Sequence, residues 1–188
     1  MNLFTLLISG IIVNNFILTK FLGLCPFLGV SDDERGTIGI SISLTIVMVL
    51  TNIITYFLYN YVLIPLNIEY LRTIIFILVI ASLVQLIEMV INHYFPKLHQ
   101  LLGIYLPLLT TNCAILGAAL LSSNNNYSLI ETIVFSIGSS LGYFIVIYLF
   151  ANIRERTQHS PIPVAFKGIP IALITASIMS LLFMRYVG

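Results

Sequence analysis

Charged side chains are scarce in this chain of 188 residues. Asp, Glu, Lys and Arg together make up 8% of the sequence and hydrophobic residues make up 59%, whereas soluble domains carry roughly 25% charged residues. Because so few charges could not cover the surface of a soluble protein, the composition predicts an integral membrane protein. The net charge of +1 indicates no nucleic-acid partner.

Cysteine is nearly absent as well. Cys25 and Cys113 are the only two, both in apolar surroundings, which argues against a secreted disulfide scaffold. The first apolar segment has no basic region and no small-residue cleavage site, so we expect no removable signal peptide. There is no phosphate-binding loop, Rossmann glycine fingerprint or Ser/His/Asp arrangement. We therefore expect the chain alone to bind no flavin or nucleotide and to perform no catalysis.

Long apolar segments dominate instead, and each is close to or above the ~20 residues that a helix needs to cross a bilayer. They cover approximately residues 2–24, 37–63, 70–92, 99–121, 129–151 and 168–186. None alternates with a period of two. The sequence therefore predicts an all-α integral membrane protein, a single membrane domain with six transmembrane helices.

The two halves of the chain resemble each other. Cys25 and Cys113 each begin the pattern C-x-x-L-G at matching places in the two halves, and an Ala-Ser pair recurs at matching places in the third and sixth segments. Because each half would cross the membrane three times, the halves would have opposite orientations. We predict two inverted three-helix repeats, at about residues 1–93 and 97–188.

Three helix-weakening residues, Gly23, Pro26 and Gly29, interrupt the end of the first segment. Non-helical backbone persists in a membrane only where protein buries it or where it lines a cavity. We therefore expect a broken first helix, with residues 23–29 in extended form and Cys25 at the break. The repeat implies a corresponding break in the fourth helix.

Basic residues are shared unequally between the two faces that six crossings create. One face receives Arg35, Lys97, Arg154, Arg156 and Lys167, and the other, which includes both termini, receives Arg72 and Arg185. Because an excess of Lys and Arg marks the cytoplasmic side, both termini are predicted outside the cytoplasm, in the periplasm of a Gram-negative bacterium.

The two cysteines are candidate metal ligands. A free Cys is usually a small buried hydrophobe, and that interpretation stays open. An inverted repeat, however, brings equivalent positions together near its axis, where two thiolates could hold a soft metal or an iron–sulfur cluster. A [2Fe–2S] cluster takes about four Cys ligands, and a tetrahedral structural zinc also takes four ligands, so two cysteines are too few for either. This interpretation predicts a partner that carries a second pair.

Residues near the cysteines form a candidate surrounding shell, made of Asn14, Lys20, Gly23, Pro26, Thr111 and Asn112. Their polar groups could donate to cluster sulfurs or could simply hold helices together. Lys20 is unusual, since a charge inside a membrane needs a partner or an aqueous path. Glu88, inside the third segment, is either an ion or proton relay or a carboxylate that reaches the cytoplasmic interface.

Six short stretches of the chain are similar to a known family. They are Asn14–Phe16, Lys20–Phe27, Tyr70–Thr73, Leu106–Ala114, Ile153–Arg156 and Ile171–Ala176. In this order they resemble the A subunit of the bacterial Rnf electron transport complex. That protein is related to the E subunit of the sodium-pumping NADH:quinone oxidoreductase. The resemblance covers nearly the whole chain.

The resemblance implies that Cys25 and Cys113 supply half the ligands of an intramembrane [2Fe–2S] cluster shared with a homologous protein of opposite orientation, the E subunit of the Rnf complex. It also implies assembly with the Rnf subunits B, C, D and G in a bacterial inner membrane, where electron transfer is coupled to translocation of Na⁺ or H⁺. The alternative is a stand-alone secondary transporter. In that case Asn14, Lys20 and Asn112 would line a substrate site and the cysteines would only pack.

Overall fold

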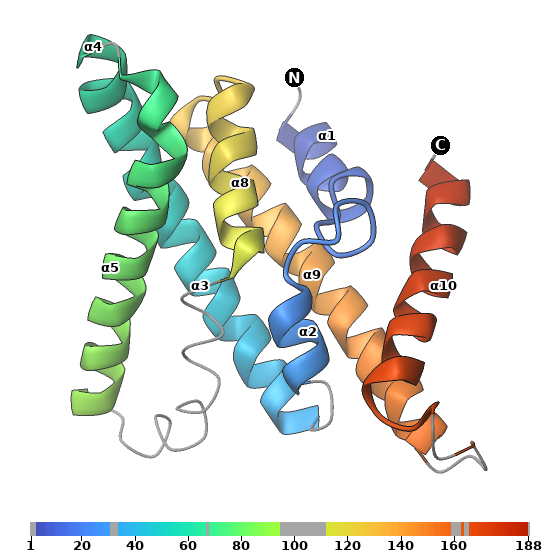
Figure 1. Ribbon diagram of the computed structural model, residues 1–188. Coiled ribbons are helices and arrows are strands. Elements are labelled where there is room, and N and C mark those ends of the chain that lie inside the picture. Colours follow the sequence, from blue (N-terminus) through green and yellow to red (C-terminus); the bar gives the residue numbers. More distant parts are fainter. Residues whose placement is uncertain are drawn as a thin grey trace.

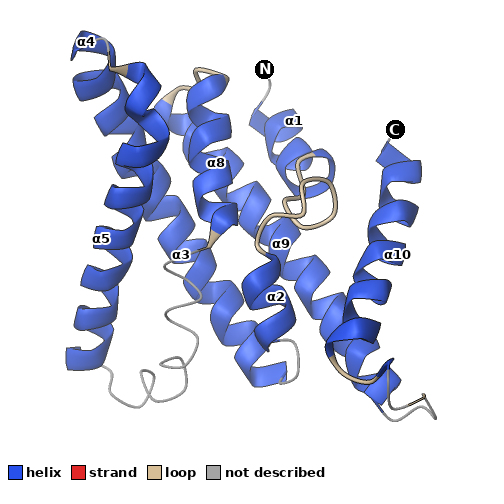
Figure 2. Cartoon of the chain, in the orientation of Figure 1, coloured by secondary structure: helices blue, strands red, loops and turns tan. Residues whose placement is uncertain are grey.

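The computed structural model describes residues 3–30, 34–66, 68–94, 112–158, 163 and 166–187. All regular secondary structure in these ranges is helical (Figure 2). Within them, Thr37–Leu66, Arg72–Val90 and Leu129–Thr157 are long and apolar enough to cross a membrane, and shorter apolar helices cover Leu3–Val13, Cys113–Asn124 and Ile169–Arg185. The prediction of an all-α membrane protein is confirmed.

Four long helices match predicted apolar segments. They are α3 (Glu34–Leu58), α5 (Arg72–Tyr94), α9 (Leu129–Gln158) and α10 (Ile169–Val187). A π-helical turn at Tyr59–Leu63 extends α3 into α4 (Ile64–Leu66), and a 3-10 turn at Glu69–Leu71 leads into α5. The fourth predicted segment is represented by α8 (Cys113–Asn124). Its first part, residues 99–111, lies outside the described residues.

Helices α3 and α9 form the centre of the bundle and run in opposite directions (Figure 1). They pack along each other, with α8 against α3 and the N-terminal helix α1 (Leu3–Ile8) against α9. Buried side chains such as Leu44, Met48 and Phe135 fill the space between them. Helices α5 and α10 lie at opposite edges of the bundle (Figure 1). Their exposed apolar side chains, for example Leu78 and Leu182, are those of helices that face lipid.

The first apolar segment is broken, but not where the sequence predicts. Helix α1 passes through a π-helical turn (Ser9–Val13) and ends at Asn14, whose N–H donates to the Ser9 carbonyl at 2.7 Å. Irregular backbone follows as far as Gly23, and Leu24–Val30 then form α2. The prediction of an extended chain over residues 23–29 is therefore wrong, because most of that stretch is helical.

The side chains explain where the break falls. Asn15 is buried, and its Nδ2 donates to the Gly142 carbonyl at 3.0 Å while its Oδ1 accepts from the Ile17 N–H at 3.2 Å. The second bond satisfies a backbone N–H that the irregular segment leaves open, and the first ties this segment to α9. Pro26 is the third residue of α2, where its missing N–H removes no intrahelical hydrogen bond.

Two glycines of α9 allow the broken segment to approach closely. A Cβ at Gly138 would lie 2.8 Å from the Leu7 carbonyl oxygen, and one at Gly142 would lie 2.6 Å from the Ile11 carbonyl oxygen. Small residues at such contacts are typical of membrane helix interfaces. The helical part of this segment, just before the break, is therefore held directly against the middle of α9.

Candidate cysteine site

The two cysteines lie at the starts of two helices. Cys25 is the second residue of α2, and Cys113 is the first residue of α8. The Gly23 N–H donates to the Cys113 Sγ at 2.9 Å. The two halves of the chain are thus in direct contact at this sulfur. The residue that contacts it, Gly23, is two positions before Cys25.

Tyr143 of α9 contributes a third group. Its side chain is fully buried, and its hydroxyl donates to the Gly23 carbonyl at 3.1 Å. Tyr143 therefore holds the same residue, Gly23, whose N–H contacts the Cys113 sulfur.

Gly23 occupies a position that only glycine fits. Its φ of +83° lies in the left-handed region, which L side chains rarely adopt. A Cβ there would lie 2.8 Å from the Cε2 of Tyr143 and 3.2 Å from the Cβ of Ala114. The backbone that presents its N–H to Cys113 thus depends on the absence of a side chain.

Asn112 caps α8 next to Cys113. Its Oδ1 accepts from the Ala114 N–H at 2.9 Å, the usual bond of an N-cap. Its Nδ2 is buried and has no hydrogen-bond partner among the described residues. Buried amide donors normally have partners, so this one is unusual. The neighbouring candidate, Thr111, lies outside the described residues.

Helix α2 is also fixed at its other end. The Phe27 ring stacks on that of Phe150, with centroids 4.0 Å apart, and Arg154 Nη1 donates to the Leu28 carbonyl at 2.7 Å. Arg154 is only 8% exposed, and hydrogen bonds from charged donors are stronger than neutral ones. The position of Cys25 is therefore set by the Gly23 turn on one side and by α9 on the other.

The two thiols differ in accessibility. Cys25 is exposed, Cys113 is half-buried, and both are free. In the part of the chain that the structure describes, no three or more His, Cys, Asp or Glu side chains lie close enough together to hold a metal ion. Two free thiols, one of which accepts an N–H bond from Gly23, are too few for a closed metal site but fit a sulfur-ligated centre that takes further ligands from another chain.

The remaining predicted residues lie elsewhere or have structural partners. Asn14 Nδ2 donates to the Ser9 hydroxyl at 3.1 Å, which secures the end of the π-helical turn. Lys20 is exposed on the irregular segment, and Pro26 is buried in the first turn of α2. Glu88 is half-buried near the C-terminal end of α5. The structure thus brings Gly23 and Asn112 to the cysteines but not Glu88.

Two residues of the site escaped the sequence-based prediction. Tyr143 follows Gly142, and the four-residue spacing of Gly138 and Gly142 indicates a close helix contact that could have pointed to it. Arg154 was counted only for orientation, because nothing in its local sequence predicts a bond to the backbone of α2.

The fold and the site define a helical membrane protein in which Cys113, at the start of α8, contacts the turn that precedes Cys25 in α2. A sequence profile described as the Rnf-Nqr membrane subunit matches residues 3–188. The chain therefore belongs to the Rnf-Nqr family of membrane subunits.

Relatives match it over almost their full length. The chain is 50% identical over 188 residues to the A subunit of the Na(+)-translocating ferredoxin:NAD(+) oxidoreductase complex of Acetobacterium woodii, a match that covers 100% of this chain and 98% of that protein. It is 51% identical over 183 residues to the A subunit of the ion-translocating oxidoreductase complex of Vibrio parahaemolyticus, covering 97% of this chain and 95% of that protein. The same figures hold for the protein of that name in Vibrio cholerae. The resemblance seen in the sequence blocks is confirmed.

Proposed function

We propose that this chain is the A subunit of an Rnf-type complex in a bacterial inner membrane, where electron transfer is coupled to translocation of Na⁺ or H⁺. The names and full-length similarity of the relatives support the assignment to the complex. The observation that carries the redox role is the 2.9 Å contact between the Gly23 N–H and the Cys113 Sγ, because it joins the two cysteine segments.

In this proposal Cys25 and Cys113 supply two thiolate ligands to a [2Fe–2S] cluster, and a homologous protein of opposite topology supplies the other two. The cluster, when bound, carries one electron at a time across the membrane. The exposure of Cys25 supports sharing with a second chain. The Gly23 N–H and the Asn112 amide would donate to sulfur, which stabilises the added negative charge of the reduced state.

The proposed architecture is six crossings in two inverted three-helix repeats, at about residues 1–93 and 97–188. It is supported by the antiparallel pair α3 and α9, one from each half, at the centre of the bundle (Figure 1). Helix α1 begins and α10 ends at the same end of the bundle (Figure 1), as an even number of crossings requires. With the basic residues inside, both termini are periplasmic. The Rnf subunits B, C, D, E and G are the proposed partners.

Replacing each cysteine tests the redox role. Cys25→Ser or Cys113→Ser should remove one iron–sulfur resonance signal, lower the iron content of the purified complex and abolish electron transfer, because Ser is a poor ligand for a soft metal site. Ser82→Ala is the control, since that exposed hydroxyl bonds only its own helix, to the Leu78 carbonyl at 2.9 Å. Unchanged iron and electron flux in both cysteine variants would favour a stand-alone transporter instead.

A further inference from the structure

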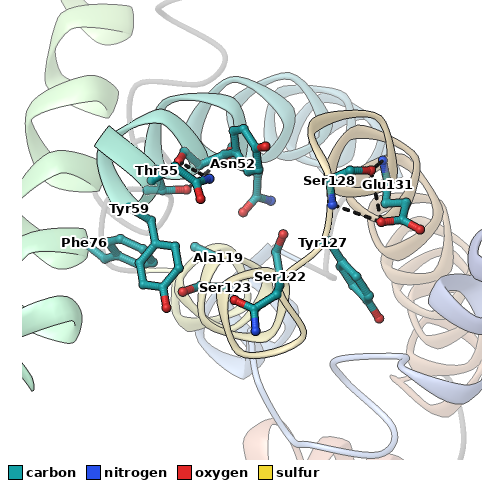
Figure 3. A pocket seen from close by; sticks show the side chains of 13 residues that line it. Asn52, Thr55, Tyr59, Phe76, Ala119, Ser122, Ser123, Tyr127, Ser128 and Glu131 are labelled. Atoms are coloured by element: carbon teal, nitrogen blue, oxygen red, sulfur yellow. Dashed lines mark hydrogen bonds between the residues drawn. The ribbon is translucent and has the colours of Figure 1, made fainter. Parts of the chain in front are cut away.

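A polar cavity lies at the end of the bundle where α8 ends and α9 begins, the same end at which α10 ends (Figure 1). Its volume is about 220 Å³, enough for several water molecules. Asn52 and Thr55 of α3 face Ser122 of α8 across it, with Tyr127 at its rim (Figure 3). Burial raises the pKa of Tyr127, so its hydroxyl stays neutral at physiological pH. Oxygen atoms of neutral groups therefore dominate this cavity.

Asn52 holds an unpartnered oxygen at the cavity. The residue is 1% exposed, and its Nδ2 donates to the Ser136 hydroxyl at 2.8 Å, which fixes the direction of the amide. Its Oδ1 is buried and has no hydrogen-bond partner among the described residues. Opposite, the Ser122 and Thr132 hydroxyls share a hydrogen bond of 2.8 Å, which leaves lone pairs on both. A buried carbonyl oxygen normally has a donor or a cation beside it.

Two charges of opposite sign flank the cavity. Glu131 lies at its mouth, where its carboxylate accepts from the Ser128 N–H and hydroxyl at 2.9 and 3.0 Å (Figure 3). Arg72 lies behind the wall, donating to the Ser123 hydroxyl at 3.1 Å with its guanidinium 5.8 Å from the Tyr59 ring centroid. One carboxylate and one guanidinium give these surroundings a formal charge of zero, which favours a weakly held monovalent cation over a divalent one, as transport requires. Hard oxygen ligands select hard cations.

A polar face of α9 leads from this cavity to the cysteine site. Thr132, Ser136, Ser139 and Tyr143 follow one another at spacings of four, three and four residues, so they share one side of the helix. All four are buried, and the Ser139 hydroxyl has no hydrogen-bond partner within the described ranges. From Thr132 to Tyr143 this face spans ~16 Å at ~1.5 Å per residue. Its far end is the Tyr143 hydroxyl on the Gly23 carbonyl.

We propose that the cavity is a binding site for a single Na⁺ ion, with the Asn52 Oδ1 and the Ser122 hydroxyl among its ligands. The ion would occupy the periplasmic part of a path whose inner end is the cysteine site. The position of the ion on such a path rests on the proposed function. The cation site itself rests on the cavity and on the unpartnered Asn52 Oδ1.

The test measures binding of Na⁺ alone to the purified, non-turning complex, by equilibrium dialysis with radioactive sodium. Asn52→Leu keeps the size of the side chain but removes its oxygen, and it should lower affinity at one site at least about tenfold, the effect of losing a direct ligand. Asn152→Leu is the matched control, because the Asn152 amide bonds only its own helix, at the Tyr148 carbonyl. It should leave binding unchanged.

A second variant separates ligand loss from misfolding. Arg72→Gln removes the opposing positive charge, so affinity should rise about threefold to tenfold, a direction that structural damage would not produce. If Asn52→Leu fails to assemble, Arg72→Gln decides alone. The proposal is overturned if the wild-type complex shows no saturable Na⁺ binding, as for a cavity that holds only water. It is also overturned if Arg72→Gln fails to tighten binding or if assembled Asn52→Leu binds normally.

The outcome is distinguishable from failure of the proposed function. A Cys25→Ser complex should lose its iron–sulfur signal yet keep the Na⁺ binding that depends on Asn52. Retention of the iron–sulfur signal in that complex would count against the redox role and leave the cation site standing.

Discussion

Gly23 bonds to the second half of the chain through both of its backbone polar groups. Its N–H reaches the Cys113 sulfur, and its carbonyl accepts from the Tyr143 hydroxyl. Both bonds require the left-handed backbone at φ +83°. At the scale of single residues, the site therefore depends as much on this backbone conformation as on the two thiols.

Gly23→Ala should disrupt the site. The left-handed conformation costs a residue with a Cβ roughly 1–2 kcal/mol, and the new Cβ would lie 2.8 Å from the Tyr143 ring. Gly168→Ala is a matched control, because Gly168 has a φ of +87° and a Cβ added there would meet nothing within 4 Å. We expect loss of the iron–sulfur resonance signal in Gly23→Ala and its retention in Gly168→Ala. Equal signals in both would show that crowding at Gly23 is unimportant.

Many residues of the site could be predicted from the sequence, because they lie in short local motifs. The cysteines, Gly23 and Asn112 stand within short motifs that look unusual in a membrane helix. Tyr143 could not be assigned in this way, because its bond to Gly23 joins positions 120 residues apart. The cavity around Asn52 was missed for the same reason, since its walls come from α3, α8 and α9.

At the scale of elements, α2 is a short helix that contacts with α9 hold at both ends. Tyr143 holds the turn before it, and Phe150 and Arg154 hold its far end. Seven residues are too few for a helix that is stable by itself. The position of Cys25 therefore depends on these contacts rather than on helix propensity.

Arg154→Gln should loosen α2. The lost bond to the Leu28 carbonyl is partly buried and charge-assisted, so we expect about 1.5–3 kcal/mol of destabilisation and a weaker, broader iron–sulfur signal. Arg156→Gln removes the same charge from the same helix at an exposed position, and it controls for effects on membrane orientation. Thermal unfolding of the complex compares the two; an equal loss in both would contradict the anchoring role.

Element lengths were predictable but the break was not. Apolar segment length correctly indicated α3, α5, α9 and α10. The break was predicted at Pro26 and Gly29, but the free-energy cost of Pro in a helix depends on its position. Pro26 lies in the first turn of α2, which tolerates it. The bond from Asn15 to the Gly142 carbonyl, 127 positions away, helps to fix the true break, and no local pattern shows it.

At the scale of the whole molecule, orientation connects the two sites to the two compartments. Arg154, Arg156 and Lys167 lie at the junction of α9 and α10, opposite the end that carries the polar cavity (Figure 1). In the proposed orientation, with the basic residues inside, the cavity would open toward the periplasm and α2 would point toward the cytoplasm.

Reporter fusions test this orientation. A reporter after Gly188 should be active only outside the cytoplasm, and one that replaces the chain after Lys167 should be active only inside, because one crossing separates them. Paired phosphatase and fluorescent-protein fusions read the two compartments independently. The reverse pattern would invert the assignment of both the cavity and the basic junction.

The central claim is that two sulfur atoms, one from each half of the chain, are ligands of a shared metal centre inside the membrane. A cryo-electron microscopy map of the intact complex tests it most directly. We expect strong metal density bonded to the Sγ atoms of Cys25 and Cys113 and to two thiols of the neighbouring protein. Density that omits either sulfur, or a Cys25 side chain surrounded by lipid acyl chains, would contradict the account.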